Sequence, residues 1–249
     1  MNREDFIIRL KENAKIIDDY IPSYFDMDYK ISEPMVYALF EGKRIRANLY
    51  FETLRMLGHD ISDLDIDFAF AIELIHTYSL VHDDLPSMDD DDFRRGRESV
   101  HKKFGEDIGV LTGDGLLNEA GSLLFNIIKK NPSYLEQASY LMDQAGYKGM
   151  IEGQVLDLRA SDYDLNYLLE VYNKKTAYLF MASIVSAGLL LDVSKEILDK
   201  LKDYAYNLGL SYQIQDDLLE DETENELNIL NVTNHESATK LLYDINAKA

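Results

Sequence analysis

The chain has 249 residues, and its 46 Asp and Glu against 25 Lys and Arg give a formal net charge of -21. Such a charge excludes the broad basic surface on which most binding to nucleic acids and to anionic membranes depends. The sequence contains no cysteine, which excludes disulfides, thiolate nucleophiles and cysteine-ligated metal centres. With 46% hydrophobic residues, 13 Gly and 4 Pro, the composition is that of a globular protein with a large core.

The first predicted helix, at about residues 3–20, is amphipathic and carries charges of both signs. It has neither the continuous apolar segment nor the small-residue cleavage site of a secretory signal peptide. The longest apolar stretch, residues 178–191, is interrupted by Ser183, Ser186 and Gly188 and is shorter than the roughly 20 residues of a membrane span. We therefore expect a cytoplasmic protein that neither inserts stably into a membrane nor binds nucleic acid.

Apolar residues recur at helical spacing along nearly the whole chain, and the alternation typical of strands is rare, so we predict an all-α fold. The expected helices cover about residues 3–20, 32–57, 63–83, 107–129, 133–157, 164–191, 194–222 and 235–248. The helix at 63–83 is apolar on nearly all sides, as is typical of the central helix of a bundle. Neither a Gly/Ser-rich linker nor an internal repeat interrupts the series, so residues 1–249 are expected to form one domain.

The first motif in chain order is basic and covers residues 42–46, Gly-Lys-Arg-Ile-Arg. In an acidic protein, such a concentration of positive charge indicates an anionic partner. A glycine beside Lys and Arg allows backbone and side chains to approach a diphosphate closely. The alternative is a set of surface salt bridges, which contribute little to stability.

The second motif is acidic and covers residues 82–96, His-Asp-Asp-Leu-Pro-Ser-Met-Asp-Asp-Asp-Asp-Phe-Arg-Arg-Gly. Carboxylates clustered at a helix C-terminus repel one another and oppose the helix dipole, so the arrangement is costly unless a cation offsets it. Mg²⁺ prefers such oxygen ligands together with substrate phosphates, and the two arginines can bind phosphate oxygens. The alternative is an ordinary solvated surface.

A third motif covers residues 212–220, Tyr-Gln-Ile-Gln-Asp-Asp-Leu-Leu-Glu. Asp216 and Glu220 are four residues apart, so their carboxylates share one face of the predicted helix. By itself this spacing is also common on exposed helices. Together with residues 82–96, it predicts two acidic walls of one metal-lined cavity.

These segments together resemble the short-chain trans-isoprenyl diphosphate synthases of the polyprenyl synthetase family, and most closely the farnesyl-producing bacterial members. The matching segments follow the family's order and cover residues 42–46, 73–96, 101–105, 113–114, 153–158, 174–176 and 213–217. The resemblance implies a single bundle of antiparallel helices around a deep central cavity, usually paired into a homodimer. It also implies a Mg²⁺-dependent transferase that condenses isopentenyl diphosphate with dimethylallyl or geranyl diphosphate to farnesyl diphosphate.

The resemblance assigns roles to individual residues. The implied Mg²⁺ ligands are carboxylates of both acidic motifs: Asp83, Asp84, Asp89, Asp216 and Glu220. The implied contacts with the allylic diphosphate are Arg94, Lys175 and Gln213, and those with isopentenyl diphosphate are Lys43, Arg46, His76 and Arg95. The implied catalytic residues are Lys175, Thr176, Asp83 and Asp216. Oxygen dipoles at Lys175 and Thr176 would stabilise the carbocation that develops when the diphosphate leaves.

Product length is a further property that the resemblance addresses. Tyr78 lies five residues before Asp83, which places it roughly 7.5 Å along the helix from the acidic end. The resemblance implies that this aromatic ring, with Ser79 beside it, forms the floor of the pocket and limits the product to fifteen carbons. The alternative is an ordinary core tyrosine, one of 17 in the chain.

The sequence departs from the family pattern towards its end. Glu220 stands where relatives usually have Asp, and relatives continue past the last residue of this chain. No Lys occurs between Lys202 and Lys240, where relatives carry a Lys-bearing loop that closes over the diphosphate. A reduced activity, and a non-catalytic or regulatory synthase-like subunit, are therefore alternatives. A helical metal phosphohydrolase using His82 and Asp83, and a terpene cyclase, account for fewer of the motifs.

Overall fold

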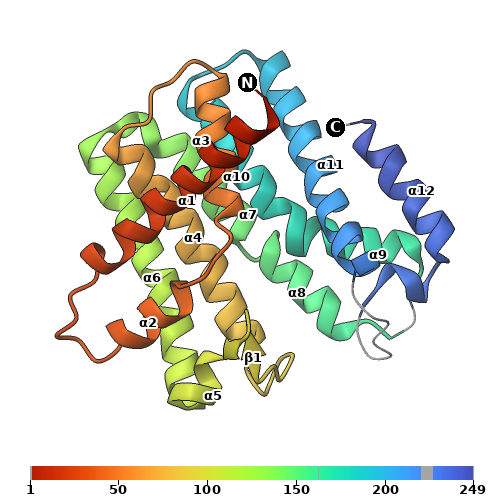
Figure 1. The fold of residues 1–249 in the computed structure, drawn as a ribbon, viewed down its shortest axis with the longest axis horizontal. Helices are drawn as coiled ribbons and strands as arrows, with labels where there is room; N and C mark the ends of the chain where they lie inside the picture. The colour runs from red at the N-terminus through yellow and green to blue at the C-terminus, as the bar shows by residue number, and fades with distance from the viewer. Residues whose placement is uncertain (1, 162, 220–226, 249) are drawn as a thin grey trace. The chain divides into compact units, whose positions relative to one another are not determined.

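The computed structural model of the protein describes residues 2–161, 163–219 and 227–248. The chain divides into two compact units, Met1–Tyr134 and Leu135–Ala249. Helices make up most of both units (Figure 1), which confirms the predicted all-α fold class. The assignment of all residues to one domain stays a prediction. Across the described ranges, no helix combines the length and the apolar character that crossing a membrane requires.

The first unit is built around helix α4. Its elements are α1 (Arg3–Tyr24), α2 (Ser32–Leu39), α3 (Ile45–Met56), α4 (Asp63–Asp83), β1 (Phe93–Arg94), β2 (Arg97–Glu98), α5 (Val100–Phe104), α6 (Glu106–Lys130) and the short η1 (Pro132–Tyr134). Helix α4 runs alongside α6 and also contacts α1, α2 and α3 (Figure 1). The central position predicted for this helix is therefore confirmed.

Local sequence explains where α4 starts and why it is central. It begins with a capping box, in which the side chains of Ser62 and Asp65 each accept from the other's backbone N–H. Residues 68–75 are all buried, so the helix presents apolar side chains in every direction. Phe70 meets the ring of Tyr24 on α1 edge-on, with the centroids 5.0 Å apart. This packing fixes the N-terminal half of α4 against α1.

The second unit contains two groups of packed helices. Its elements are α7 (Leu135–Ala145), α8 (Met150–Arg159), α9 (Leu165–Tyr172), η2 (Asn173–Ala177), α10 (Tyr178–Leu190), α11 (Lys195–Leu219), η3 (Ile229–Asn231) and α12 (His235–Asn246). The apolar helix α10 packs against α7 and α11. A separate small core joins α9, α11, η3 and α12 and consists of Leu168, Tyr172, Leu210, Ile214, Ile229, Ala238 and Ile245.

Two predicted helices were wrong because each is broken by a turn. The helix predicted at 32–57 is two helices, and Glu41 and Arg44 in the intervening turn have φ angles of 62° and 53°. The helix predicted at 133–157 breaks before Gly149, where a Cβ would lie 1.9 Å from the carbonyl oxygen of Gln144. In both segments apolar spacing continues across the turn, so periodicity alone does not reveal it.

The hairpin β1–β2 is a second feature that the sequence did not predict. Its strands have two residues each and pair Phe93 with Glu98 and Arg94 with Arg97, which is too short for alternation to be recognised. Arg95 and Gly96 at the turn have φ angles of 55° and 76°, the left-handed pair that a tight hairpin turn requires. The hairpin thus fixes the two arginines that follow the aspartates of the acidic motif.

Candidate active site

The acidic motif begins at the C-terminal end of α4, where Asp83 is the last helical residue and Asp84 is the C-cap. The chain then turns over residues 85–88, and the backbone N–H of Asp89 donates to the carbonyl oxygen of Asp83 at 2.9 Å. This bond brings Asp89 back to the end of the helix, where Asp83 is half-buried and Asp89 is exposed. Two carboxylates at one helix end match the oxygen ligands that Mg²⁺ takes from proteins.

Asp84 and Arg94, which the sequence assigned to different ligands, bond to each other. The Nε of Arg94 donates to Oδ1 of Asp84 at 2.8 Å, and its Nη2 donates to Oδ2 of Asp91 at 3.0 Å. Burial raises the pKa of Asp84, and the bonds from Arg94 oppose that rise. Burial alone would lower the pKa of Arg94, but the bond to Asp84 and the nearby acidic charges raise it overall. Asp84 and Arg94 are thus paired in this structure, and their roles towards Mg²⁺ and the allylic diphosphate stay predictions.

The basic motif brings positive charge to the side of α4. The Nη1 of Arg46 lies 3.0 Å from Nε2 of His76. Burial, followed by the charges of Arg46 and Arg95, lowers the pKa of His76 well below its ordinary range. Since a guanidinium only donates, Nε2 accepts and the neutral imidazole carries its proton on Nδ1. Lys43 is exposed two residues before α3 begins. The charged Arg46 and Arg95 thus lie around the neutral His76 beside α4.

Arg44 is a residue whose role the sequence did not reveal, because it is a buried member of a motif expected at the surface. Its side chain is fully buried, and it contacts Asp18 at 2.9 Å and Glu73 at 3.3 Å. It also donates to the carbonyl oxygen of Leu39. A Cβ on Gly42 would lie 2.5 Å from Nη1 of Arg44, so only glycine leaves room for this guanidinium. Arg44 therefore stabilises the turn that contains Lys43 and leads to Arg46.

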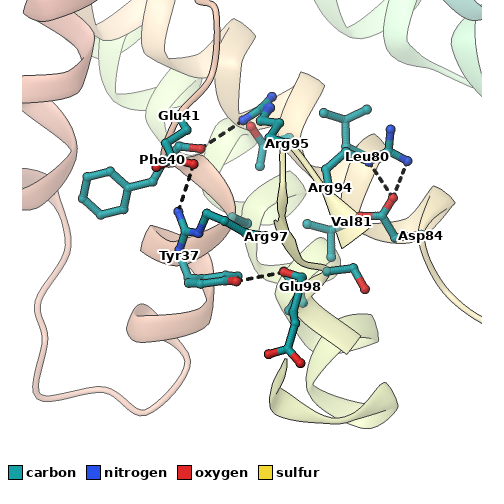
Figure 2. Close-up of a pocket in the computed structure, with 14 residues that line it drawn as sticks. Tyr37, Phe40, Glu41, Leu80, Val81, Asp84, Arg94, Arg95, Arg97 and Glu98 are labelled. Atoms are coloured by element: carbon teal, nitrogen blue, oxygen red, sulfur yellow. Dashed lines mark hydrogen bonds and ion pairs between the residues drawn. The ribbon is translucent and has the colours of Figure 1, made fainter. Parts of the chain in front are cut away.

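The hairpin borders an open pocket, whose volume of about 390 Å³ includes solvent outside its mouth (Figure 2). Its lining consists of Tyr37, Ala38, Phe40, Glu41, Thr77, Leu80, Val81, Asp84, Arg94, Arg95, Arg97, Glu98, Ser99 and Val100. Arg95 donates to the carbonyl oxygen of Phe40 at 3.2 Å, and the Tyr37 hydroxyl donates to that of Glu98 at 2.8 Å. These bonds tie the hairpin to α2 and place Arg94 and Arg95 in the wall of one pocket.

Tyr78, the predicted floor of the substrate pocket, is buried on α4. Burial and the charge of Asp83 raise the pKa of Tyr78 to about 12, so the phenol is neutral at physiological pH. Its ring lies edge-on to the ring of His82 at a centroid distance of 6.0 Å. Beside it, the hydroxyl of Ser79 donates to the carbonyl oxygen of His76 at 2.9 Å. The burial agrees with either interpretation of Tyr78, and its role in chain length stays a prediction.

His82 is engaged with helix α6. Its Nε2 lies 3.0 Å from the carbonyl oxygen of Val110, an atom that can only accept. A Cβ on Gly113 would lie 2.1 Å from the same nitrogen, so the glycine makes room for the ring. This contact uses Nε2 as a donor, so only Nδ1 of His82 could ligate a metal, as the phosphohydrolase alternative requires.

In the second unit, the segment Asn173–Ala177 forms a π-helical turn, η2, between α9 and α10. Two glycines allow neighbouring helices to approach it. A Cβ on Gly153 of α8 would lie 2.3 Å from the backbone nitrogen of Lys175, and one on Gly209 of α11 would lie 2.5 Å from Cα of Ala177. Single π turns inside helices frequently mark functional sites. This turn carries Lys175 and Thr176, both predicted site residues.

Predicted residues of the second unit gather around this π turn. The Nζ of Lys175 forms an ion pair with Asp157 of α8. The hydroxyl of Thr176 donates to Oε1 of Gln213 at 2.8 Å, and Nε2 of Gln213 donates to Oδ1 of Asp217 at 3.0 Å. Thr176 and Gln213 are therefore in direct contact, while the catalytic and binding roles of these residues stay predictions.

Asp217 is a further residue that the sequence did not single out. It is 2% exposed, whereas Asp216 beside it is half-buried. Burial raises the pKa of Asp217, and hydrogen bonds from Tyr172, Ile229 and Gln213 oppose the rise. The two neighbouring aspartates thus differ in environment because they lie on different faces of α11.

The second predicted metal motif is only partly described. Asp216 belongs to α11, but Glu220 lies outside the described residues, so the pairing of these two carboxylates stays a prediction. Within residues 2–161, 163–219 and 227–248, no group of three or more His, Asp or Glu side chains is arranged to hold a metal ion. Among the described residues, the Mg²⁺ prediction therefore rests on Asp83, Asp84, Asp89 and Asp216.

A family model described as polyprenyl synthetase matches residues 28–228, a range that contains all the motifs above. The chain belongs to the polyprenyl synthetase family. Farnesyl diphosphate synthases of Bacillus subtilis (strain 168) and Micrococcus luteus are 36% and 38% identical to it. The two alignments cover 87% and 88% of this chain and 76% and 74% of the relatives.

Solved structures agree with this membership. The apo crystal structure of an FPP/GFPP synthase from Zymomonas mobilis superposes with a TM-score of 0.88 at 31% identity, covering 97% of this chain and 89% of that one. A geranyltransferase from Legionella pneumophila gives a TM-score of 0.87 at 29% identity, with coverages of 97% and 88%. The family resemblance predicted from the motifs is therefore confirmed, and the helical bundle fold with it.

Proposed function

We propose that this polyprenyl synthetase condenses isopentenyl diphosphate with dimethylallyl or geranyl diphosphate to form farnesyl diphosphate. The observation that carries the proposal is the end of α4, where a backbone bond returns Asp89 to Asp83 and Arg94 of the hairpin binds Asp84. Carboxylates for Mg²⁺ beside arginines for phosphate are what a diphosphate-releasing enzyme needs. The farnesyl diphosphate synthases among the relatives support the same product.

Mg²⁺ is the cofactor of the proposed reaction, and the available donors fit it. Asp83, Asp84 and Asp89 would hold it on the first unit, and Asp216 with Glu220 on the second. All five are carboxylates, the oxygen ligands with which proteins bind Mg²⁺ next to substrate phosphates. Bound Mg²⁺ would supply positive charge that stabilises the departing diphosphate.

Separate groups of the chain would bind the two diphosphates. Arg94, Lys175 and Gln213 would contact the allylic diphosphate, and Lys43, Arg46, His76 and Arg95 the isopentenyl diphosphate. In the second group, His76 accepts from Arg46 through Nε2, so its Nδ1–H can donate to a phosphate oxygen. A neutral imidazole held among arginines adds a donor without adding charge repulsion.

The reaction separates charge inside an apolar pocket. The bond between C1 and oxygen of the allylic substrate breaks, and its electron pair leaves with the diphosphate. The double bond of isopentenyl diphosphate then forms the new carbon–carbon bond, and the proton that is lost passes to the released diphosphate. Oxygen atoms at Lys175 and Thr176 would stabilise the cation, and Tyr78 with Ser79 would limit the length of the growing chain.

A cytoplasmic homodimer completes the proposal. The cytoplasmic location is compatible with a chain that has no cysteine to be oxidised or reduced. The dimer is carried over from the family resemblance.

Product analysis tests the proposal. The purified chain is incubated with Mg²⁺, isopentenyl diphosphate and geranyl diphosphate, and the products are separated by chromatography. We expect farnesyl diphosphate, and we expect it to disappear on addition of EDTA and in Asp83→Asn. Release of inorganic phosphate without a longer chain would point to the phosphohydrolase. Absence of turnover with a folded protein would favour the non-catalytic subunit.

A further inference from the structure

The carboxylate of Asp217 accepts three hydrogen bonds inside the second unit. The backbone N–H of Ile229 donates to Oδ2 at 2.7 Å, and the hydroxyl of Tyr172 donates to the same oxygen. Nε2 of Gln213 donates to Oδ1 at 3.0 Å. Since the side chain is 2% exposed, both oxygens are used within the protein. The environment of Asp217 is therefore not that of a metal ligand, which is the role proposed for Asp216.

The donors around Asp217 impose a direction on the hydrogen bonds that lead to the π turn. Oδ1 of Asp217 accepts from Nε2 of Gln213, so Gln213 turns its NH₂ group towards Asp217. The amide oxygen of Gln213 then faces away, and the hydroxyl of Thr176 donates to it at 2.8 Å. The order is therefore Thr176 to Gln213 to Asp217, with every donor and acceptor determined by the carboxylate.

This direction determines whether the hydroxyl of Thr176 presents its oxygen or its hydrogen to the surroundings. A hydroxyl has one proton, and Thr176 spends that proton on Gln213, so its oxygen is left with acceptor capacity alone. If the amide of Gln213 were flipped, its NH₂ would donate to Thr176 and the hydroxyl proton would point elsewhere. An oxygen with exposed lone pairs stabilises a positive charge, whereas an outward-pointing O–H opposes it.

We propose that Asp217 is a positioning residue that orients the amide of Gln213 and, through it, the hydroxyl dipole of Thr176. This inference rests on the proposed function, because the dipole matters only if a cation develops beside Thr176. Asp217 itself would touch neither the substrate nor the metal. The bonds from Tyr172 and Ile229 hold the carboxylate in place and tie α9 and η3 to α11.

Asp217→Asn tests this inference, with Tyr172→Phe as the matched control. The asparagine keeps the volume but can offer its NH₂ to Gln213, which allows the amide to flip. We expect kcat to fall about 10- to 100-fold, the range typical of lost outer-shell partners. The KM values for both substrates should stay within about 3-fold, because neither substrate loses a contact. Tyr172→Phe removes one hydrogen bond to the same carboxylate and leaves the relay intact, so kcat should change less than about 3-fold.

A double-mutant cycle distinguishes positioning from a merely structural role. Thr176→Val removes the hydroxyl through which Asp217 is proposed to act. In that background, Asp217→Asn should lower kcat by less than about 2-fold further, since interacting residues are not additive. Losses that multiply, or equal losses in Asp217→Asn and Tyr172→Phe, would overturn the inference.

Nuclear magnetic resonance of the Gln213 side-chain amide provides a readout that does not need activity. The NH₂ bonded to a buried carboxylate should exchange slowly with solvent, and Asp217→Asn should shift its resonances and speed exchange, while Tyr172→Phe should not. If the wild-type chain forms no product, the proposed function is wrong. The hydrogen bonds from Thr176 through Gln213 to Asp217 are then tested by this measurement alone. Unchanged Gln213 resonances in Asp217→Asn would refute the inference.

Discussion

Replacing Arg44 with methionine tests the buried ion pair beneath the basic motif. The guanidinium is fully buried between Glu73, 3.3 Å away, and Asp18, 2.9 Å away. Methionine keeps much of the side-chain length but removes every donor. Glu73, whose side chain is 2% exposed, then retains the backbone N–H of Ala47 at 3.2 Å as its described partner. The substitution therefore strands a negative charge in the core.

The size of the effect follows from this burial. Removing one partner of a buried ion pair costs about 3–5 kcal/mol, because the remaining charge is uncompensated. Asp18 adds little, since its side chain is 47% exposed and solvent screens its charge. The left-handed φ of 53° at position 44 is equally unfavourable for arginine and methionine, so the backbone contributes no difference. We expect Arg44→Met to lower the free energy of unfolding by about 3–5 kcal/mol.

Urea unfolding followed by circular dichroism measures this loss. Arg55→Met is the control on the same helix. Arg55 pairs with Glu52 at 2.7 Å and donates to Asn13 at 2.8 Å, but its side chain is 28% exposed, so its loss should cost less than that of Arg44. Adding Glu73→Gln to Arg44→Met removes the stranded charge and should recover part of the stability. If Arg44→Met is no less stable than Arg55→Met, or if the second change lowers stability further, the reasoning about the buried pair is refuted.

Three other changes test separate features of the structure. Because the pKa of His76 is depressed in the fold, the unfolded chain binds a proton below about pH 6.5 that the folded chain does not, so stability should fall as the pH drops through that value. His76→Gln should flatten this dependence in unfolding curves at pH 5 and pH 7, and an unchanged slope would contradict it. Tyr78→Ala should lengthen the product seen by chromatography, and the same product profile as wild type would remove its role as the floor. Gly153→Ala places a Cβ 2.3 Å from the backbone of Lys175 and should destabilise by about 1–3 kcal/mol, whereas Gly121→Ala, with nothing within 4 Å, should not. Equal melting temperatures of the two alanine variants would show that the backbone at Lys175 shifts to accommodate the new Cβ.

Helical periodicity predicted the long, evenly patterned elements well. The helix expected at 63–83 is Asp63–Asp83, and the one expected at 107–129 is Glu106–Lys130. The turn between α2 and α3 escaped prediction because it depends on Arg44 in a left-handed conformation. Arginine is not a residue associated with positive φ, and its conformation here is held by buried partners distant in sequence.

In the site, the sequence predicted which residue types occur but not which contacts they make. Clustered acids and bases identified the segments that carry the chemistry, because such clusters need ligands or counter-charges. Which partner each side chain takes was not readable from the sequence. Asp216 and Asp217 are adjacent and chemically identical, yet Asp216 is half-buried, whereas Asp217 is buried and accepts hydrogen bonds from Tyr172 and Gln213. Likewise, Asp84 bonds Arg94 through a turn that has no periodic signal.

Isothermal titration calorimetry with a non-ionisable allylic diphosphate analogue tests the proposed Mg²⁺-dependent binding most directly. The titration is run with Mg²⁺ and with EDTA on the wild-type chain, Asp83→Asn and Asp216→Asn. We predict binding that requires Mg²⁺ and is weakened at least about 10-fold by either substitution. Binding that is equally tight in EDTA, or that survives unchanged in Asp216→Asn, would contradict the proposed metal-assisted release of diphosphate.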